Sequence, residues 1–232
     1  MRIVAIETSE AVGSVAALWG DEVLIERRLP LEKGTASALA PAILEILRQA
    51  GWSPSQIQGV GVTVGPGSFT GLRVGVTTAK TLAYATQAAV AGIDTFAAIA
   101  AACPSDVTHL AVAIDGQQGQ IVCGTFRRGP DGELAAVGPW QLVDRDIWLA
   151  SLPHGIAVAG SALRGLSEKL PQGVRALDSR FWGPTASVVG RLAARRFARG
   201  ECDDLWSLAP RYHRRSAAEE RWERRQQNDQ AG

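Results

Sequence analysis

The chain has 232 residues, of which 46% are hydrophobic and 20% are charged, and its formal net charge is +1. This length can hold one ordinary domain or two small lobes with a sizeable core. The charge balance gives no global reason to bind nucleic acid or a membrane, and three cysteines without a Cys-x-x-Cys pair argue against a disulfide scaffold and a zinc site.

The first segment, 1–7, is an apolar run that is too short for a signal peptide and that ends in an acid, Glu7. No later segment of the sequence has 18 consecutive apolar residues free of charge and proline, so none is expected to span a bilayer. These observations favour a cytoplasmic protein.

The opening of the chain is repeated about half a chain length later. The sequence VAIE at 4–7 returns as VAID at 112–115, and each copy reads as a strand that ends in a carboxylate. Two further strands and their turns follow each copy, over 14–29 and over 120–137. Two such meanders predict two related lobes that face each other across a cleft. The alternative is a chance similarity of short strands.

A glycine-rich run at 65–75, GPGSFTGLRVG, joins an expected buried strand over 57–64 to an expected helix over 72–85. Gly65 and Gly67 can adopt positive φ, and either Ser68 or Thr70 can cap the helix. Such a junction either binds an anion at the helix N-terminus or only positions the helix. Its spacing matches neither a P-loop nor a dinucleotide-binding fingerprint.

Small residues leave one face of this helix nearly bare. Gly71, Gly75 and Ala79 recur every four residues, which allows another element to approach the helix backbone closely. We expect this face to dock another protomer rather than to lie in the interior. An earlier helix is expected over 36–49, with an apolar stripe that includes Leu39 and Ile43.

The lobe boundary is expected near 103–106. The predicted domains are an N-terminal lobe over 1–104, which carries the partner-binding helices, a smaller C-terminal lobe over 105–216 and a frayed tail over 217–232. Within the second lobe the pattern predicts short helices over 144–152 and 161–170, and a longer helix over 185–199.

Two meanders, each with a first strand that ends in an acid, match the outline of the actin and sugar-kinase type of ATPase fold. The chain resembles the bacterial TsaB (YeaZ) family, which is required for making threonylcarbamoyladenosine in tRNA. The resemblance rests on IVAIETS at 3–9, GPGSFTGLR at 65–73, AID at 113–115 and the closing motif Pro210-x-Tyr212-x-Arg214. It implies an α/β, actin-like (ASKHA) ATPase fold, in which each of two related lobes opens with an antiparallel three-stranded meander in a mixed sheet.

The resemblance also implies an accessory subunit rather than an enzyme. Such a subunit pairs with the related catalytic subunit TsaD and the ATPase TsaE to form N6-threonylcarbamoyladenosine next to the anticodon of tRNAs reading ANN codons. A homodimer is expected in the absence of TsaD, with contact to tRNA that is indirect or weak. The partner surface is expected on the two N-lobe helices, at Leu39, Ile43, Thr70, Gly71, Val74, Gly75, Thr78, Ala79 and Leu82.

Candidate contacts to a nucleotide or anion are Glu7, Thr8, Ser9, Gly65, Gly67, Ser68 and Asp115. No cofactor is firmly assigned, although ATP or ADP would be the candidate at the cleft or at the partner interface. The first strand ends in Glu7 where an aspartate is usual, and residues 116–118 lack the usual basic pair. Both departures weaken the expectation of tight nucleotide binding.

No catalytic residue and no metal site are expected. His109, His154 and His213 are isolated in the sequence, whereas the catalytic relative holds a metal through paired histidines. The rival hypothesis is a self-sufficient actin-fold ATPase or small-molecule kinase, and a peptidase has little support because no Gly-x-Ser-x-Gly elbow is present. The arginine-rich segment 211–225 is interleaved with glutamates, which favours a solvated surface over a tRNA contact.

Overall fold

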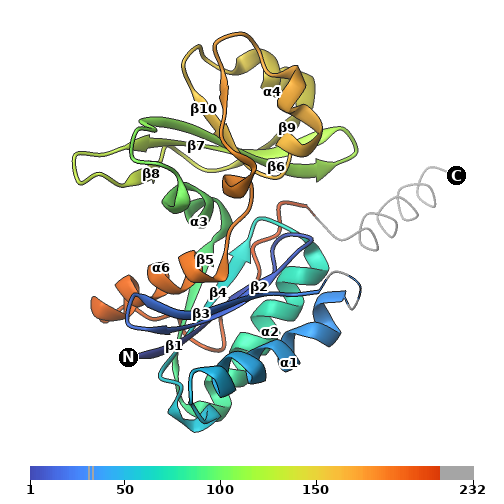
Figure 1. Cartoon of the computed structure of the whole chain (residues 1–232). Coiled ribbons are helices and arrows are strands. Elements are labelled where there is room, and N and C mark those ends of the chain that lie inside the picture. Colours follow the sequence, from blue (N-terminus) through green and yellow to red (C-terminus); the bar gives the residue numbers. More distant parts are fainter. Residues whose placement is uncertain (31, 33, 215–232) are drawn as a thin grey trace, which may run out of the picture.

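The computed structural model describes the whole chain except residues 31, 33 and 215–232. Two lobes stand one above the other, each built around a mixed β-sheet (Figure 1). The strand order is β3-β2-β1-β4-β5 in the N-terminal lobe and β8-β7-β6-β10-β11 in the C-terminal lobe. Because the two orders correspond strand for strand, the predicted pair of related lobes, each opening with an antiparallel meander, is confirmed.

The N-lobe strands are β1 (Arg2–Glu7), β2 (Ser14–Trp19), β3 (Glu22–Arg28), β4 (Gly59–Gly65) and β5 (Ala89–Asp94). The first three form the meander, and β4 and β5 continue the sheet in parallel with β1. In this register Glu7 pairs with Ser14 at the end of β1 that faces the other lobe.

Helices cover both faces of the N-lobe sheet. One face packs against α1 (Gly34–Gln49) and α2 (Phe69–Thr86), through a core that includes Ile6, Ile46 and Val76. The other face packs against α6 (Ala186–Ala198), whose Gly190 lets the helix approach β1 and β2 closely. The predicted C-terminal lobe of 105–216 is therefore corrected, because α6 returns to the first sheet.

The C-lobe strands are β6 (His109–Gln117), β7 (Gln120–Arg128), β8 (Leu134–Ala136), β9 (Gln141–Asp144), β10 (Ala157–Ala159) and β11 (Arg175–Ala176). The sheet face toward the N-lobe packs against α3 (Thr95–Ala102). The outer face packs against α4 (Arg145–Ser151) and α5 (Leu163–Leu166). The molecule thus stacks helices, sheet, helices, sheet and helices, with α3 and α6 between the two sheets (Figure 1).

Two further elements, β5 and α3, follow α2 and were not among those predicted from the sequence. The carboxylate of Asp94 caps α3 by accepting hydrogen bonds from the amides of Phe96 and Ala97, at 2.9 and 3.1 Å, so the helix starts directly where β5 ends. Phe96 and Ile99 are fully buried beneath the C-lobe sheet. This helix carries the chain from one lobe to the other.

A strap of residues 203–214 runs back along α2. The carboxylate of Asp203 accepts a hydrogen bond from the amide of Gly92 at 2.7 Å, and the ammonium of Lys80 donates to the carbonyls of Trp206 and Leu208, both at 3.0 Å. The strap therefore belongs to the N-lobe, while the predicted frayed tail, 217–232, lies outside the described residues. Across the described part of the chain, no helix has the length and apolar character needed to cross a bilayer.

Candidate functional site

The glycine-rich run forms the expected strand-to-helix junction between β4 and α2. Ser68 caps α2, because its hydroxyl oxygen accepts a hydrogen bond from the amide of Gly71 at 3.2 Å. Gly65 has a positive φ of 119°, whereas Gly67 does not, so the expectation for Gly67 was wrong. Position 67 favours glycine for a different reason, since a Cβ there would collide with the backbone oxygen of Ser9. The junction therefore packs closely against the loop that follows β1.

Glu7 anchors that loop from inside the lobe. It is fully buried, and its Oε1 accepts hydrogen bonds from both the amide and the hydroxyl of Ser9, each at 2.6 Å. Its Oε2 has no partner among the residues that the structure describes. Burial raises the pKa of Glu7 to about 8, only partly offset by the bonds from Ser9. At neutral pH Glu7 is mainly a neutral acid that positions Ser9.

A cavity of about 570 Å³ lies between the lobes, next to this loop. Of the seven predicted nucleotide or anion contacts, Ser9, Gly67, Ser68 and Asp115 line it. Glu7 and Thr8 are fully buried and do not line it, nor does Gly65, whose Cα faces the backbone oxygen of Arg211. The structure therefore brings together only part of the predicted set.

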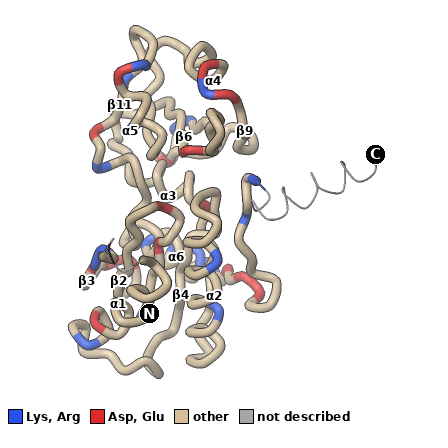
Figure 2. The backbone as a smooth tube through the Cα atoms, turned by 90° about the vertical axis from the view of Figure 1, so that its right-hand side faces the viewer, with Lys and Arg blue, Asp and Glu red and all other residues tan. Residues whose placement is uncertain are grey.

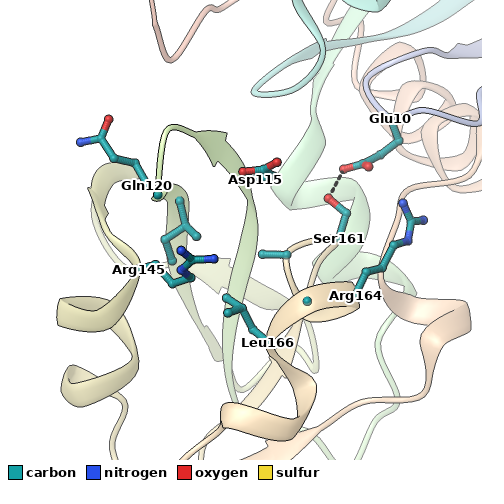
Figure 3. Close-up of a pocket in the computed structure, with 11 residues that line it drawn as sticks. Glu10, Asp115, Gln120, Arg145, Ser161, Arg164 and Leu166 are labelled. Carbon is teal, nitrogen blue, oxygen red and sulfur yellow. Dashed lines mark hydrogen bonds between the residues drawn. The ribbon is translucent and has the colours of Figure 1, made fainter.

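A hydrogen bond joins the lobes across the cleft. The hydroxyl of Ser161, at the start of the segment that leads into α5, donates to Oε1 of Glu10 at 2.8 Å (Figure 3). Burial raises the pKa of Glu10, and the bond from Ser161 and the charge of Arg164 oppose that rise. Glu10 therefore acts as a link between the two lobes.

The strap contributes cleft residues that sequence reasoning missed. The ring of Tyr212 stacks on the ring of Phe69, with the two ring centroids 4.4 Å apart. The guanidinium of Arg73 also lies over the ring of Phe69, 4.7 Å from its centroid. His213 also lines the cavity, and desolvation, reinforced by the charge of Arg214, lowers its pKa. The closing motif at 210–214 was the available signal, but only the fold shows that it meets α2.

The bare face of α2 turns inward. Gly71, Gly75 and Ala79 are buried, and a Cβ on either glycine would collide with Thr8. The expectation that this face docks another protomer is therefore wrong, because the chain's own loop fills it. Leu39 and Ile43 of α1 are likewise buried in the core.

The outer surface of α1 and α2 presents other members of the predicted set. Thr70 is exposed, and Val74, Thr78 and Leu82 are half-buried. Charges on α2 are limited to Arg73, which lies over Phe69, and Lys80, which is bound to the strap. Figure 2 accordingly draws most of this pair of helices in tan. Within the described ranges, no group of three or more His, Cys, Asp or Glu side chains is arranged to hold a metal ion.

Comparison with known proteins places this geometry in a family. Residues 32–222 match the model for TsaD, tRNA N6-adenosine threonylcarbamoyltransferase. The chain is 29% identical to the tRNA threonylcarbamoyladenosine biosynthesis protein TsaB of Bacillus subtilis, over 96% of this chain and 98% of that protein. It is 30% identical to TsaB of Escherichia coli, over 94% and 96%. Among solved structures, a Pseudomonas aeruginosa protein described as similar to peptidase YEAZ matches with a TM-score of 0.78 and 26% identity, over 92% and 99%.

Proposed function

The chain belongs to the TsaD-related family and, within it, to the TsaB (YeaZ) group, and on that premise we propose that it is a non-catalytic subunit that holds a TsaD-type catalytic subunit through the outer surface of α1 and α2. Group membership assigns it a role in tRNA threonylcarbamoyladenosine biosynthesis and implies a TsaD-type partner. The scaffold role, the docking surface and a cytoplasmic location are our proposals.

The observation that carries the proposal is an uncharged strip between the exposed sides of the two helices. On α1, Ala36, Ala40 and Leu44 are exposed and recur every four residues, so they share one side of the helix. The opposite flank of α1 faces β3, since Arg27 of β3 pairs with Glu45 at 3.2 Å. The Ala36–Leu44 row therefore lies on the side toward α2.

The matching row on α2 consists of hydroxyl-bearing and apolar residues. Thr70, Thr77 and Thr81 are exposed, and Val74 and Thr78 are half-buried beside them. Cores of protein interfaces are depleted of charged residues, and small side chains allow two helices to pack closely. The strip thus suits a helix pair on a partner, and a second copy of this chain can use the same surface when the partner is absent.

The interior supports a positioning role for the acid that ends β1. Glu7 is enclosed and bonded to Ser9 rather than presented to the cleft. A carboxylate that acted directly on a nucleotide or its metal would need to reach the cavity. In this account catalysis resides in the partner, TsaE joins as a further component, and contact with tRNA is indirect.

The test is reconstitution of the modification from purified components. With the TsaD-type subunit and the other components present, we expect threonylcarbamoylated tRNA only when this chain is added. Leu44→Arg and Thr77→Arg place a charge on the strip and should abolish both partner binding and product. Leu24→Arg on β3 is the matched control, because Leu24 is also exposed but lies away from the strip. Undiminished product without the chain would overturn the proposal.

A second candidate, a self-sufficient ATPase or small-molecule kinase, is favoured by one observation. Asp115 lines the inter-lobe cavity together with Ser9 and Ser68. If this candidate were correct, the purified chain alone would turn over ATP and Asp115→Ala would abolish the activity. If the purified chain alone did not turn over ATP, the scaffold role would be the better explanation.

A further inference from the structure

Two aromatic side chains, Tyr84 near the C-terminal end of α2 and Trp206 on the strap, lie together in solvent. Trp206 is 74% exposed and Tyr84 is 59% exposed, and Trp206 is the most exposed large apolar side chain in the described part of the chain. Their rings meet edge to face, with the two ring centroids 5.8 Å apart. A contiguous pair of exposed aromatic rings marks an interaction site, because each ring buries a large area when a partner covers it.

The strap holds the backbone of Trp206 in place while its indole points outward. Leu205 and Leu208, on either side of it in the sequence, pack against the N-lobe core. The amide of Leu208 donates to the carbonyl of Asp204 at 3.0 Å, and the ammonium of Lys80 donates to the carbonyl of Trp206 at 3.0 Å. A turn that is already fixed in the free chain loses little conformational freedom when a partner covers it. The strap is therefore built to present the indole.

Tyr84 connects this aromatic pair to the uncharged strip of α1 and α2. Thr77, Thr81 and Tyr84 follow one another at intervals of four and three residues, so they lie on one side of α2, and all three are exposed. Tyr84 thus continues the threonine row by one turn toward the C-terminal end of the helix. Lys80, one turn before Tyr84, binds the strap, so Trp206 borders the same row. A partner that covers the strip therefore meets both rings.

The chemistry of the two rings indicates what the partner must offer. Each ring has a large apolar body and one polar group, the hydroxyl of Tyr84 and the indole N–H of Trp206. Within the described residues, neither polar group has a hydrogen-bond partner, so both can bond to a partner protein. An apolar recess with hydrogen-bond acceptors at its rim matches this pair.

We propose that Tyr84 and Trp206 anchor the TsaD-type subunit, with both rings entering an apolar recess on that subunit when it covers the strip. This inference rests on the proposed docking surface and adds to it the side chains that contribute most to the affinity. In protein interfaces a few buried tryptophan, tyrosine and arginine side chains account for most of the binding free energy. The small side chains of the strip allow close packing, and the aromatic pair supplies the large contact area.

The first test measures the affinity of the full chain for the purified TsaD-type subunit by titration calorimetry. Trp206→Ala should weaken binding about thirtyfold and Tyr84→Ala about tenfold, because each variant removes a large contact area. Trp206→Phe keeps an aromatic ring and should recover part of the loss. Ile147→Ala is the matched control and should leave the affinity unchanged, since Ile147 is 68% exposed but lies on α4 of the C-lobe. All four variants change exposed side chains, so each should keep the unfolding midpoint of the native protein.

The second test asks whether the indole of Trp206 itself is covered. In the chain labelled with 5-fluorotryptophan, the fluorine resonance of Trp206 is the one that disappears in Trp206→Phe. Its shift between H2O and D2O reports contact with solvent. We expect that shift in the free chain, where the side chain is 74% exposed, and its loss when the TsaD-type subunit is added.

The outcomes separate this inference from the docking surface on which it rests. If Leu44→Arg abolishes binding and Trp206→Ala leaves the affinity unchanged, the docking surface stands and the aromatic anchor is wrong. If Leu44→Arg has no effect, or the native chain does not bind, the docking surface fails and the anchor fails with it. The anchor is also overturned if Trp206 stays in contact with solvent in the complex. An effect of Trp206→Ala on self-association alone would assign the pair to a second copy of this chain and overturn it as well.

Discussion

Thr8 lies directly over Gly75, so that the hydroxyl oxygen of Thr8 takes the place that a Cβ atom on Gly75 would need. Gly75 is one turn along α2 from Gly71, where the backbone oxygen of Thr8 blocks a Cβ in the same way. The loop after β1 and the first turns of α2 therefore share one closely packed contact. Because this loop also carries Ser9 and Glu10 into the cleft, the contact joins the core of the N-lobe to the candidate site.

Gly75→Ala should destabilise the protein even though alanine is the better helix former. The new methyl group would collide with the hydroxyl of Thr8, and overpacking of this kind costs about 1–3 kcal/mol. Urea unfolding followed by circular dichroism measures the loss. Gly165→Ala is the control, since its methyl group would meet nothing within 4 Å and should not reduce the free energy of unfolding.

A double-mutant cycle with Thr8→Ala identifies the cause. Thr8→Ala removes the hydroxyl, which is buried and has no hydrogen-bond partner among the described residues, and should restore much of the stability lost in Gly75→Ala. Losses that simply add in the double variant would show that Thr8 and Gly75 do not clash. Substitution of Gly75 by a long side chain is unsuited to testing the partner surface, because it would disrupt the fold.

The spacing of Gly71, Gly75 and Ala79 thus predicted a closely packed helix face correctly but not what fills it. Periodicity shows which side of a helix permits a close approach, and it carries no information on whether the approaching backbone belongs to the same chain. The strand-to-helix junction, by contrast, depends on local chemistry. Of the two predicted caps, Ser68 and Thr70, Ser68 is the one that caps α2.

The missed helix α3 shows a different limit. Its sequence, TFAAIAAA, is apolar nearly all round because α3 lies between the C-lobe sheet and α6, so no amphipathic period marks it. For a related reason, the sequence does not show that Arg145 and Arg164 line the same pocket (Figure 3). They belong to separate short helices, and only the tertiary structure brings them to one pocket.

Glu7→Gln should change how stability depends on pH. The folded-state pKa of Glu7 is raised to about 8 from an ordinary value of 4.5, so the unfolded chain loses this proton first as the pH rises. The contribution of the neutral acid is fully present below pH 4.5 and is lost on the way to about pH 8, at up to about 1.4 kcal/mol per pH unit. Glutamine stays neutral, and its carbonyl can still accept the bonds from Ser9.

The measurement is the free energy of unfolding of the native protein and of Glu7→Gln at a series of pH values. All other titrating groups are common to both proteins, so the difference isolates Glu7. We expect the variant to gain stability relative to the native protein as the pH rises from 5 to 8. Curves that run parallel over this range would show that Glu7 is already ionised in the folded state.

Lys80→Met should release the strap from α2 without unfolding the lobe. The variant keeps the methylene length of the side chain but loses two bonds to the carbonyls of Trp206 and Leu208. The amide of Arg211, which donates to Val64, should then exchange its hydrogen faster in deuterium oxide, since local opening of the strap becomes easier. Lys169→Met, at an exposed lysine of the C-lobe, is the control. An unchanged exchange rate at Arg211 in Lys80→Met would contradict the role of Lys80.

Ser161→Ala should weaken the link between the lobes and raise the pKa of Glu10 further. The hydroxyl of Ser161 donates to Oε1 of Glu10 at 2.8 Å and favours the ionised carboxylate, so its removal leaves the effect of burial less opposed. Loss of the bond should lower the free energy of unfolding by about 1 kcal/mol. Carbon-13 NMR of the Glu10 carboxyl group gives the pKa. Ser151→Ala, which removes a hydroxyl that donates to the carbonyl of Trp148 within α4, should leave that pKa unchanged. An identical Glu10 titration in Ser161→Ala and the native protein would mean that the lobes are not joined at this point in solution.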